Sequence, residues 1–175
     1  MFKMIVPAML SIAGTTVAVC AVHAAEFYVG EPIVRDGMQL APAYLTGIQM
    51  DRMPPGMAMT PDAPHFEIDI HATDGESHGF PPDAWIPYLT VTATIEKPGS
   101  SYREEKQLYP MTAGDGPHYA NNFAMAGSGD YRITYVVQPP SAQGFIRHVD
   151  QATGVPDWWQ PITLSWSFHY PSNAK

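Results

Sequence analysis

The order of apolar and polar positions along the chain predicts an all-β protein. Short runs rich in β-branched and aromatic residues recur, separated by Pro, Gly, Asp and Ser, and no window shows a long apolar period of 3.6 residues. The 18 prolines are also difficult to place in helices. The spacing of the runs favours a β-sandwich over βαβ units. We predict strands at residues 27–34, 44–49, 65–72, 84–96, 102–109, 119–125, 130–137 and 163–169, and a loop at 50–64.

The strand predicted at residues 65–72 alternates strictly between apolar and polar side chains. Successive side chains of a strand point to opposite faces, so three apolar residues face the core and four polar residues share the other face. Polar neighbours two apart lie about 6.5–7 Å apart along the strand, close enough to bend toward one metal ion. The solvated outer face of a sandwich explains the same pattern, and both interpretations stay open. The polar residues are His65, Glu67, Asp69 and His71.

Two further segments carry candidate ligands. Residues 111–122 have the Gly and Pro content of a tight loop between strands, and a hairpin-like return would bring Met111 close to His118. A thioether selects Cu(I) or tolerates ferrous iron. The alternative is that Met111 fills a gap in the core and His118 caps a turn. His148 is flanked by apolar residues, where a structural histidine is more common than a ligand.

Composition narrows the classes of partner. The 175 residues are 45% hydrophobic, which fits one globular domain rather than a disordered chain. A net charge of −8 argues against nucleic acid and anionic lipid, since both require a basic surface. One Cys excludes a disulfide scaffold and a zinc site with several thiolates. Ten Met and seven His on an acidic chain fit a protein that binds cations.

The first 24 residues read as a secretory signal peptide, followed by one metal-binding domain at 25–175. Lys3 supplies the positive start, residues 4–22 are apolar or small, and Val22-His23-Ala24 has the small-x-small pattern of a cleavage site. An uncleaved membrane anchor is the alternative, because the apolar run approaches the ~20 residues that span a bilayer. Cleavage would remove the single Cys, so an oxidising compartment would not affect the mature chain.

Four segments together closely resemble the periplasmic iron-transport protein family, the metal-binding component that accompanies high-affinity ferrous-iron permeases of Gram-negative bacteria. The resemblance extends from about Glu26 to the end of the chain. It implies an immunoglobulin-like β-sandwich that forms homodimers and carries a copper/iron site near the dimer interface. In chain order the segments are GMQLAPAYLTGIQM, HFEIDIHA, YPMTAGDGPHYANNF and FIRHVDQATGVPDWWQPITLSWSF.

The resemblance also implies the residues of the site. His65, Glu67, Met111, His118 and His148 match the family's metal ligands. Two acidic residues outside this set, Asp69 and Asp115, are expected to support the site, whereas His71 and His78 are not family ligands. Several loop methionines either line a route to the site or cover it as apolar packing: Met38, Met50, Met53, Met57 and Met59.

The function that the resemblance implies is a periplasmic accessory of iron uptake. It would bind iron and copper, and work with an inner-membrane iron permease and the associated oxidase or ferredoxin-like components. The residues alone indicate a metal-binding sandwich, and a periplasmic copper chaperone or copper-resistance protein is the alternative. The motif H-E-x-x-H and a nucleotide-binding loop are absent from the sequence, so a binding protein is favoured over an enzyme. Copper-dependent oxidation of ferrous iron is the enzymatic activity left open.

Overall fold

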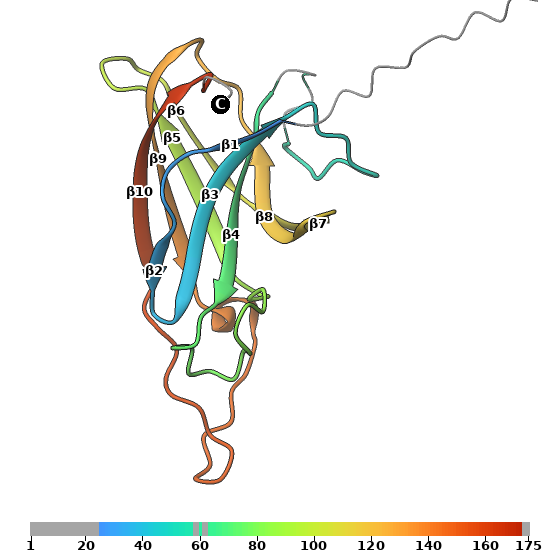
Figure 1. Cartoon of the computed structure of the whole chain (residues 1–175), viewed down its shortest axis with the longest axis vertical. Coiled ribbons are helices and arrows are strands. Elements are labelled where there is room, and N and C mark those ends of the chain that lie inside the picture. Colours follow the sequence, from blue (N-terminus) through green and yellow to red (C-terminus); the bar gives the residue numbers. More distant parts are fainter. Residues whose placement is uncertain (1–24, 58–59, 61–62, 173–175) are drawn as a thin grey trace, which may run out of the picture.

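Two antiparallel sheets packed face to face make up the protein (Figure 1). The computed structural model describes residues 25–57, 60 and 63–172. One sheet has the order β1-β3-β4-β8-β7, with β2 also paired to β3, and the other has the order β10-β9-β5-β6. This architecture confirms the predicted immunoglobulin-like β-sandwich. The strands are β1 (Ala25–Tyr28), β2 (Ile33–Arg35), β3 (Met38–Thr46), β4 (His65–Ala72), β5 (Thr90–Glu96), β6 (Arg103–Gln107), β7 (Tyr109–Ala113), β8 (Gly116–Asn122), β9 (Gly129–Gln138) and β10 (Ile162–Tyr170).

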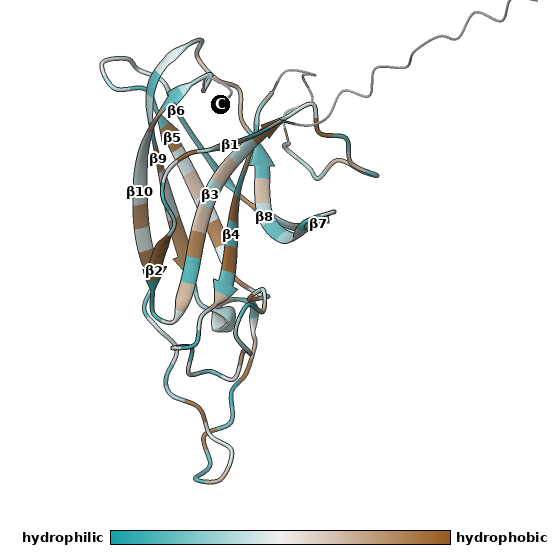
Figure 2. Ribbon diagram, in the orientation of Figure 1, coloured by the Kyte–Doolittle hydropathy of each residue, from teal (hydrophilic) through white to brown (hydrophobic). Residues whose placement is uncertain are grey.

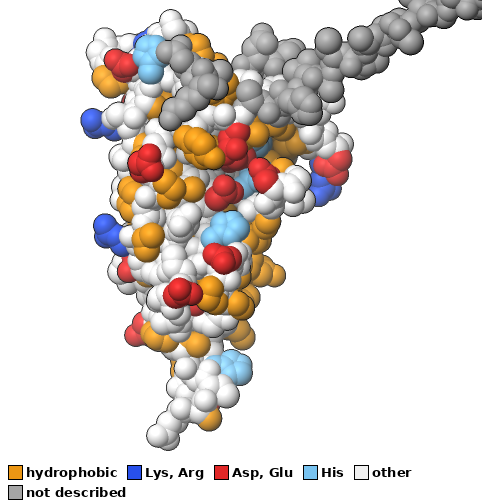
Figure 3. Space-filling model, in the orientation of Figure 1, with side chains coloured by type: hydrophobic (Ala, Val, Ile, Leu, Met, Phe, Trp, Pro, Cys, Tyr) orange, Lys and Arg blue, Asp and Glu red, His pale blue; other side chains and the backbone are white. Residues whose placement is uncertain are grey.

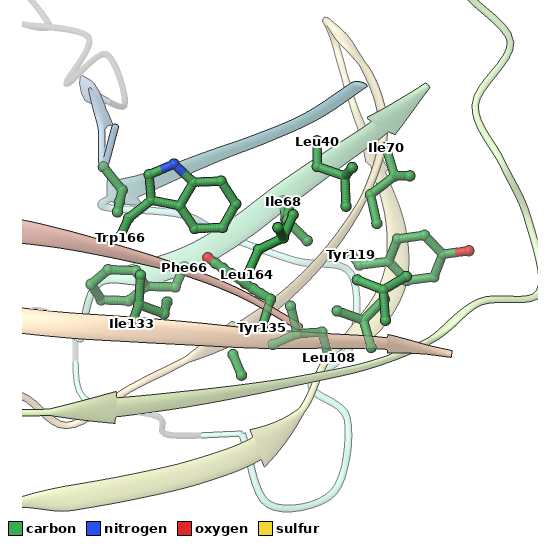
Figure 4. Packing of buried hydrophobic residues seen from close by; sticks show 14 of the residues in the cluster. Leu40, Phe66, Ile68, Ile70, Leu108, Tyr119, Ile133, Tyr135, Leu164 and Trp166 are labelled. Carbon is green, nitrogen blue, oxygen red and sulfur yellow. The ribbon is translucent and has the colours of Figure 1, made fainter. Parts of the chain in front are cut away.

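The hydrophobic core lies between the two sheets, and β4 contributes its apolar face to it. Phe66, Ile68 and Ile70 are fully buried, as the alternation predicts. They lie opposite residues of the second sheet that include Ile133 and Tyr135 (Figure 4). Apolar and polar bands alternate along the strands in Figure 2. Each large apolar side chain buried in this way contributes about 1.5–3 kcal/mol to folding, so the core fixes which face of β4 points outward.

The segment at residues 111–122 is not a loop as predicted, because β7 and β8 form a hairpin there that turns at Gly114 and Asp115. Pro117 belonged to the Gly and Pro content that predicted a loop, yet it is tolerated in β8, and Pro110 in β7, at this edge of the sheet. Among the described residues, β7 is the edge strand of its sheet, and β4 pairs with β8 only between Tyr119 and Asn122. A proline can therefore sit there without breaking a ladder on both sides.

Strand β3 replaces the strand predicted at 44–49; it is longer and begins earlier, at Met38. Met38 is therefore a strand residue and not a loop residue, and it is fully buried in the core. Pro42 lies inside β3. The Pro42 carbonyl accepts a hydrogen bond from Val29 N, and the ring nitrogen of a strand residue faces the same neighbour as its carbonyl. On that side β1 has ended and β2 has not begun, so the sheet requires no N–H donor at Pro42. The strand predicted at 84–96 forms only over β5, and a single bridge joins Trp85 to His71 before it.

Two features at the ends of the molecule bear on function. The predicted signal peptide, residues 1–24, lies outside the described residues. In the part that is described, no helix has the length and apolar character needed to cross a membrane. The segment between the short 3-10 turn η1 (Pro140–Gln143) and β10 extends beyond the ends of the strands at the bottom of Figure 1.

Candidate metal centre

A buried cluster of two imidazoles and one carboxylate lies on the outer face of β4 and β8. One ligand atom from each of His65, Glu67 and His118 lies within 4.8 Å of the other two. Their side chains belong to residues that are only 2%, 5% and 5% exposed. The predicted polar face of β4 is therefore not solvated at this end. Imidazole nitrogens and carboxylate oxygens are common metal ligands, so their meeting in a buried place makes this cluster a candidate metal centre.

The strand register explains why the carboxylate has room at the centre. Ala43 of β3 and Ala120 of β8 lie directly opposite Glu67 on its two sides. Residues directly opposite each other in an antiparallel pair share a face of the sheet. Two methyl side chains therefore flank Glu67, and the space between the neighbouring strands is left to the carboxylate and its ligand partners.

Both imidazoles are held by a hydrogen bond on the sheet. The Nδ1–H of His65 donates to Asn122 Oδ1 at 2.7 Å, because an amide oxygen only accepts. His118 has a hydrogen bond to the main chain of Gly116. Its Nε2 lies 3.4 Å from Glu67 Oε2 and is buried, with no hydrogen-bond partner among the residues that the structure describes. A buried polar atom without a partner is costly, so this nitrogen is a natural place for a metal ion.

The electrostatics of the cluster favour a cation. Burial lowers the pKa of His65 and of His118, which keeps both imidazoles neutral, the form that binds metal. The pKa of Glu67 is raised to about 8, mainly by burial and then by the negative charges of Asp69, Glu26 and Asp115 in that order. Four carboxyl groups close together repel one another when ionised, and a metal ion would relieve that repulsion.

Three of the expected residues lie around this cluster. Met111 of β7 is directly opposite His118 of β8, so the chain return predicted for this segment does bring the two together. Asp69 continues the outer face of β4, where it lines a groove with His71 and Asp83. Asp115 lies at the β7–β8 turn, and its charge acts on both Glu67 and His118. Figure 3 shows acidic and His side chains gathered on the middle of this face.

Within a single chain, His148 does not lie at the cluster. His148 lies in the segment between η1 and β10, and its side chain is 74% exposed. Its Nδ1 is 2.7 Å from Thr153 Oγ1. In Figure 1 this segment projects from the end of the sandwich that β4 reaches with its last residues, whereas His65 begins β4 at the other end.

The remaining histidines and methionines have other surroundings. His71 hydrogen-bonds the Asp83 carbonyl at 2.9 Å. His78 contacts Glu76 Oε1 at 2.8 Å and stacks on Trp158 with the ring centres 4.8 Å apart, which anchors the segment that leads to β10. Both lie outside the cluster. Of the loop methionines, Met59 is outside the described residues, and the others are half-buried or buried: Met50, Met53 and Met57.

Sequence reasoning missed two residues of this region. Asn122 is directly opposite His65, and Glu26 of β1 lies opposite Leu45, which in turn lies opposite His65. Alternation along β8 was a usable signal for Asn122, because His118 and Asn122 are four residues apart and share a face. Glu26 had no local signal, since only the pairing of β1 with β3 places it here.

The fold and the cluster define an all-β protein with a buried His/Glu cluster that could hold a metal ion. The chain belongs to the family described as Fe2+ transport protein, whose model matches residues 23–172. A protein of Brucella abortus is 37% identical over 159 residues, covering 87% of this chain and 86% of the relative.

Solved structures of two bacterial proteins are similar over most of the chain. FetP of uropathogenic E. coli is 42% identical with a TM-score of 0.77, covering 83% of this chain and 96% of FetP. Copper-reconstituted P19 of Campylobacter jejuni is 36% identical with a TM-score of 0.78, covering 86% of this chain and 99% of P19. A variant of FetP is also known with copper bound. Copper binding in these relatives makes copper the first metal to test here.

Proposed function

We propose that this protein binds copper and iron at the His65–Glu67–His118 centre and serves iron uptake in the periplasm. The observation that carries the proposal is the meeting of two neutral imidazoles and one carboxylate within 4.8 Å in a buried place. Imidazole suits copper and iron, and carboxylate suits harder cations. The copper-bound forms of P19 and of a FetP variant support copper as a metal that this protein binds.

Two overlapping donor sets serve the two metals. The imidazoles with the Met111 thioether form a soft set for copper, and Glu67 with the charges of Asp69 and Asp115 forms a harder, more acidic set for iron. The family description, Fe2+ transport protein, supports iron as the cargo. The expected partners are an inner-membrane iron permease and its oxidase or ferredoxin-like components.

Deletion of the gene in the native bacterium tests this function. We expect slow growth in iron-limited medium and normal tolerance of copper, with growth restored by the wild-type gene and not by a gene that encodes His118→Ala. Copper sensitivity with normal growth at low iron would overturn the iron-uptake role. That result would support the alternative, a periplasmic copper chaperone or copper-resistance protein, which the copper-bound relatives also make plausible.

A second copy of the chain would explain the position of His148. The segment that carries it also exposes Ile146 and Val149, at 87% and 76%. Exposed apolar residues that gather in one segment are a feature of surfaces that another protein covers. We propose a homodimer in which this segment of one copy approaches the metal centre of the other copy, so that His148 adds a third imidazole.

His148→Ala is expected to weaken Cu(II) binding about tenfold or more and to remove one nitrogen from the copper coordination, without dissociating the dimer. The reason is that the apolar neighbours, and not His148, hold the two copies together. Electron paramagnetic resonance of the copper-loaded protein and analytical ultracentrifugation measure the two effects. His169→Ala is the matched control, because His169 is exposed and paired with Asp130 on β10. Identical copper spectra for wild type and His148→Ala would exclude His148 as a ligand.

Met111→Leu is expected to weaken Cu(I) binding by about tenfold or more while changing Cu(II) affinity much less, because a thioether is a soft donor. Leucine keeps most of the side-chain volume, so the β7–β8 hairpin should stay intact. Competition with a Cu(I)-specific chelator measures the loss. Met125→Leu is the control, since Met125 Sδ contacts Tyr102 Oη at 3.9 Å on another part of the sandwich. Equal Cu(I) affinities for Met111→Leu and wild type would remove Met111 from the ligand set.

A further inference from the structure

We propose that Asn122 is a positioning residue of the metal centre: its side-chain amide holds the His65 ring in the one tautomer and orientation that present Nε2 to the metal. This inference rests on the proposed metal-binding function. It adds a residue that touches no metal and acts through His65.

The contact between the two side chains defines the tautomer. His65 Nδ1 and Asn122 Oδ1 are 2.7 Å apart, a short hydrogen bond. The amide oxygen has no hydrogen to give, so Nδ1 must carry the proton. A neutral imidazole that is protonated on Nδ1 has its lone pair on Nε2. The two residues are only 2% and 6% exposed, so water competes poorly for either partner.

The backbone brings the amide to this position and keeps it there. His65 and Asn122 are direct partners in the β4–β8 register, which places their Cβ atoms about 4.5–5.5 Å apart. The main-chain carbonyl of Asn122 accepts a hydrogen bond from Lys106 Nζ at 2.7 Å. Lys106 belongs to β6 of the other sheet and pairs with Glu104 at 2.8 Å. The orientation of the His65 ring is thus tied to both sheets of the sandwich.

The second imidazole follows the same design. His118 is hydrogen-bonded to the Gly116 main chain, and its Nε2 faces Glu67 without a hydrogen bond of its own. The two rings lie edge to face, with centres 5.9 Å apart and planes at 81°. Metal-ligating histidines generally donate their other N–H to an acceptor that fixes tautomer and ring orientation. At His65 a neutral amide takes the place that a carboxylate often has, so no further negative charge is added beside Glu67.

Three variants separate positioning from a merely structural role. Asn122→Leu removes the acceptor, and Asn122→Asp keeps an acceptor oxygen at the same place. Asn121→Leu is the matched control: Asn121 is 3% exposed, points to the opposite face, and donates to the Gln107 carbonyl at 2.8 Å. We expect Asn122→Leu to lose about 10–100-fold in Cu(II) affinity, Asn122→Asp to restore most of it, and Asn121→Leu to bind copper as the wild type does.

The tautomer itself is measured without metal and without a variant. In the metal-free wild type labelled with 15N-histidine, long-range NMR correlations should show His65 protonated on Nδ1 and unprotonated on Nε2. A proton on Nε2 would overturn the inference, and so would wild-type copper affinity in folded Asn122→Leu. If the wild type binds no copper, the proposed function fails, while the tautomer still decides whether Asn122 orients His65.

Discussion

His118→Ala is expected to lower the affinity for Cu(II) by more than about 100-fold and to leave the metal-free protein folded. His118 Nε2 is buried beside Glu67 Oε2 at 3.4 Å and has no hydrogen-bond partner in the described part of the chain, so the variant gives up no described hydrogen bond at that atom. Removing an outer partner of a metal ligand typically costs 10–100-fold, and removing a ligand should cost more. Titration of the purified protein against a competing chelator measures the affinity, and circular dichroism measures the fold.

His71→Ala is the matched control for this prediction. His71 lies on the same outer face of β4 but contacts the Asp83 carbonyl and not the cluster. Its loss should leave Cu(II) affinity unchanged. Equal losses in the two variants would mean that copper binds diffusely along the acidic face, and equal affinity of His118→Ala and wild type would place the metal elsewhere on the protein.

Local pattern was enough to predict part of this centre. The strict alternation at residues 65–72 gave β4 with its true bounds, and the same alternation put His65 and Glu67 on one face. The Gly-rich sequence after Met111 indicated a chain return that would bring it toward His118, and the register confirms that return. These features depend on neighbours in the sequence, which is why they are visible in one chain without its structure.

Other features depend on contacts between distant segments and had no local signal. Nothing in the sequence distinguishes an outer face that water covers from one that neighbouring segments bury, as happens at His65 and Glu67. Glu26 reaches the centre only because β1 pairs with β3. Met38 was predicted as a loop residue, and the predicted strand began only after Pro42. The proline fits inside β3 because its nitrogen faces the gap between the end of β1 and the start of β2.

The buried carboxylate at the centre links metal binding to the stability of the metal-free protein. Glu67 is buried between two alanines, and three other carboxyl groups act on it, so without a metal burial first and repulsion second favour its protonated form. A cation at the centre would replace that proton. The cost of ionising Glu67 without a metal should therefore appear as a loss of stability at high pH.

Glu67→Gln is expected to remove a fall in stability that the metal-free wild type shows between pH 7 and pH 8.5. The pKa of Glu67 is about 8 in the folded protein against 4.5 as its ordinary value. Between these values the folded state binds more protons than the unfolded chain, so the free energy of unfolding decreases as pH rises. Over pH 7–8.5 the wild type should lose about 1 kcal/mol from this group. Urea unfolding with a chelator present measures it at each pH.

Two histidines of the centre affect the pH dependence of stability in the opposite direction, so the measurement on Glu67 is made above the pH range in which they titrate. Burial lowers the pKa values of His65 and His118 below 6.5, so their contribution to stability is present above pH 6.5 and is lost as the pH falls toward the folded pKa. Glu105→Gln is the control, because the neighbouring Arg103 lowers the pKa of this exposed carboxyl and it titrates far below the window. Parallel stability curves for Glu67→Gln and wild type from pH 7 to 8.5 would show that Glu67 is already ionised at neutral pH, and the proton would then have no part in metal binding.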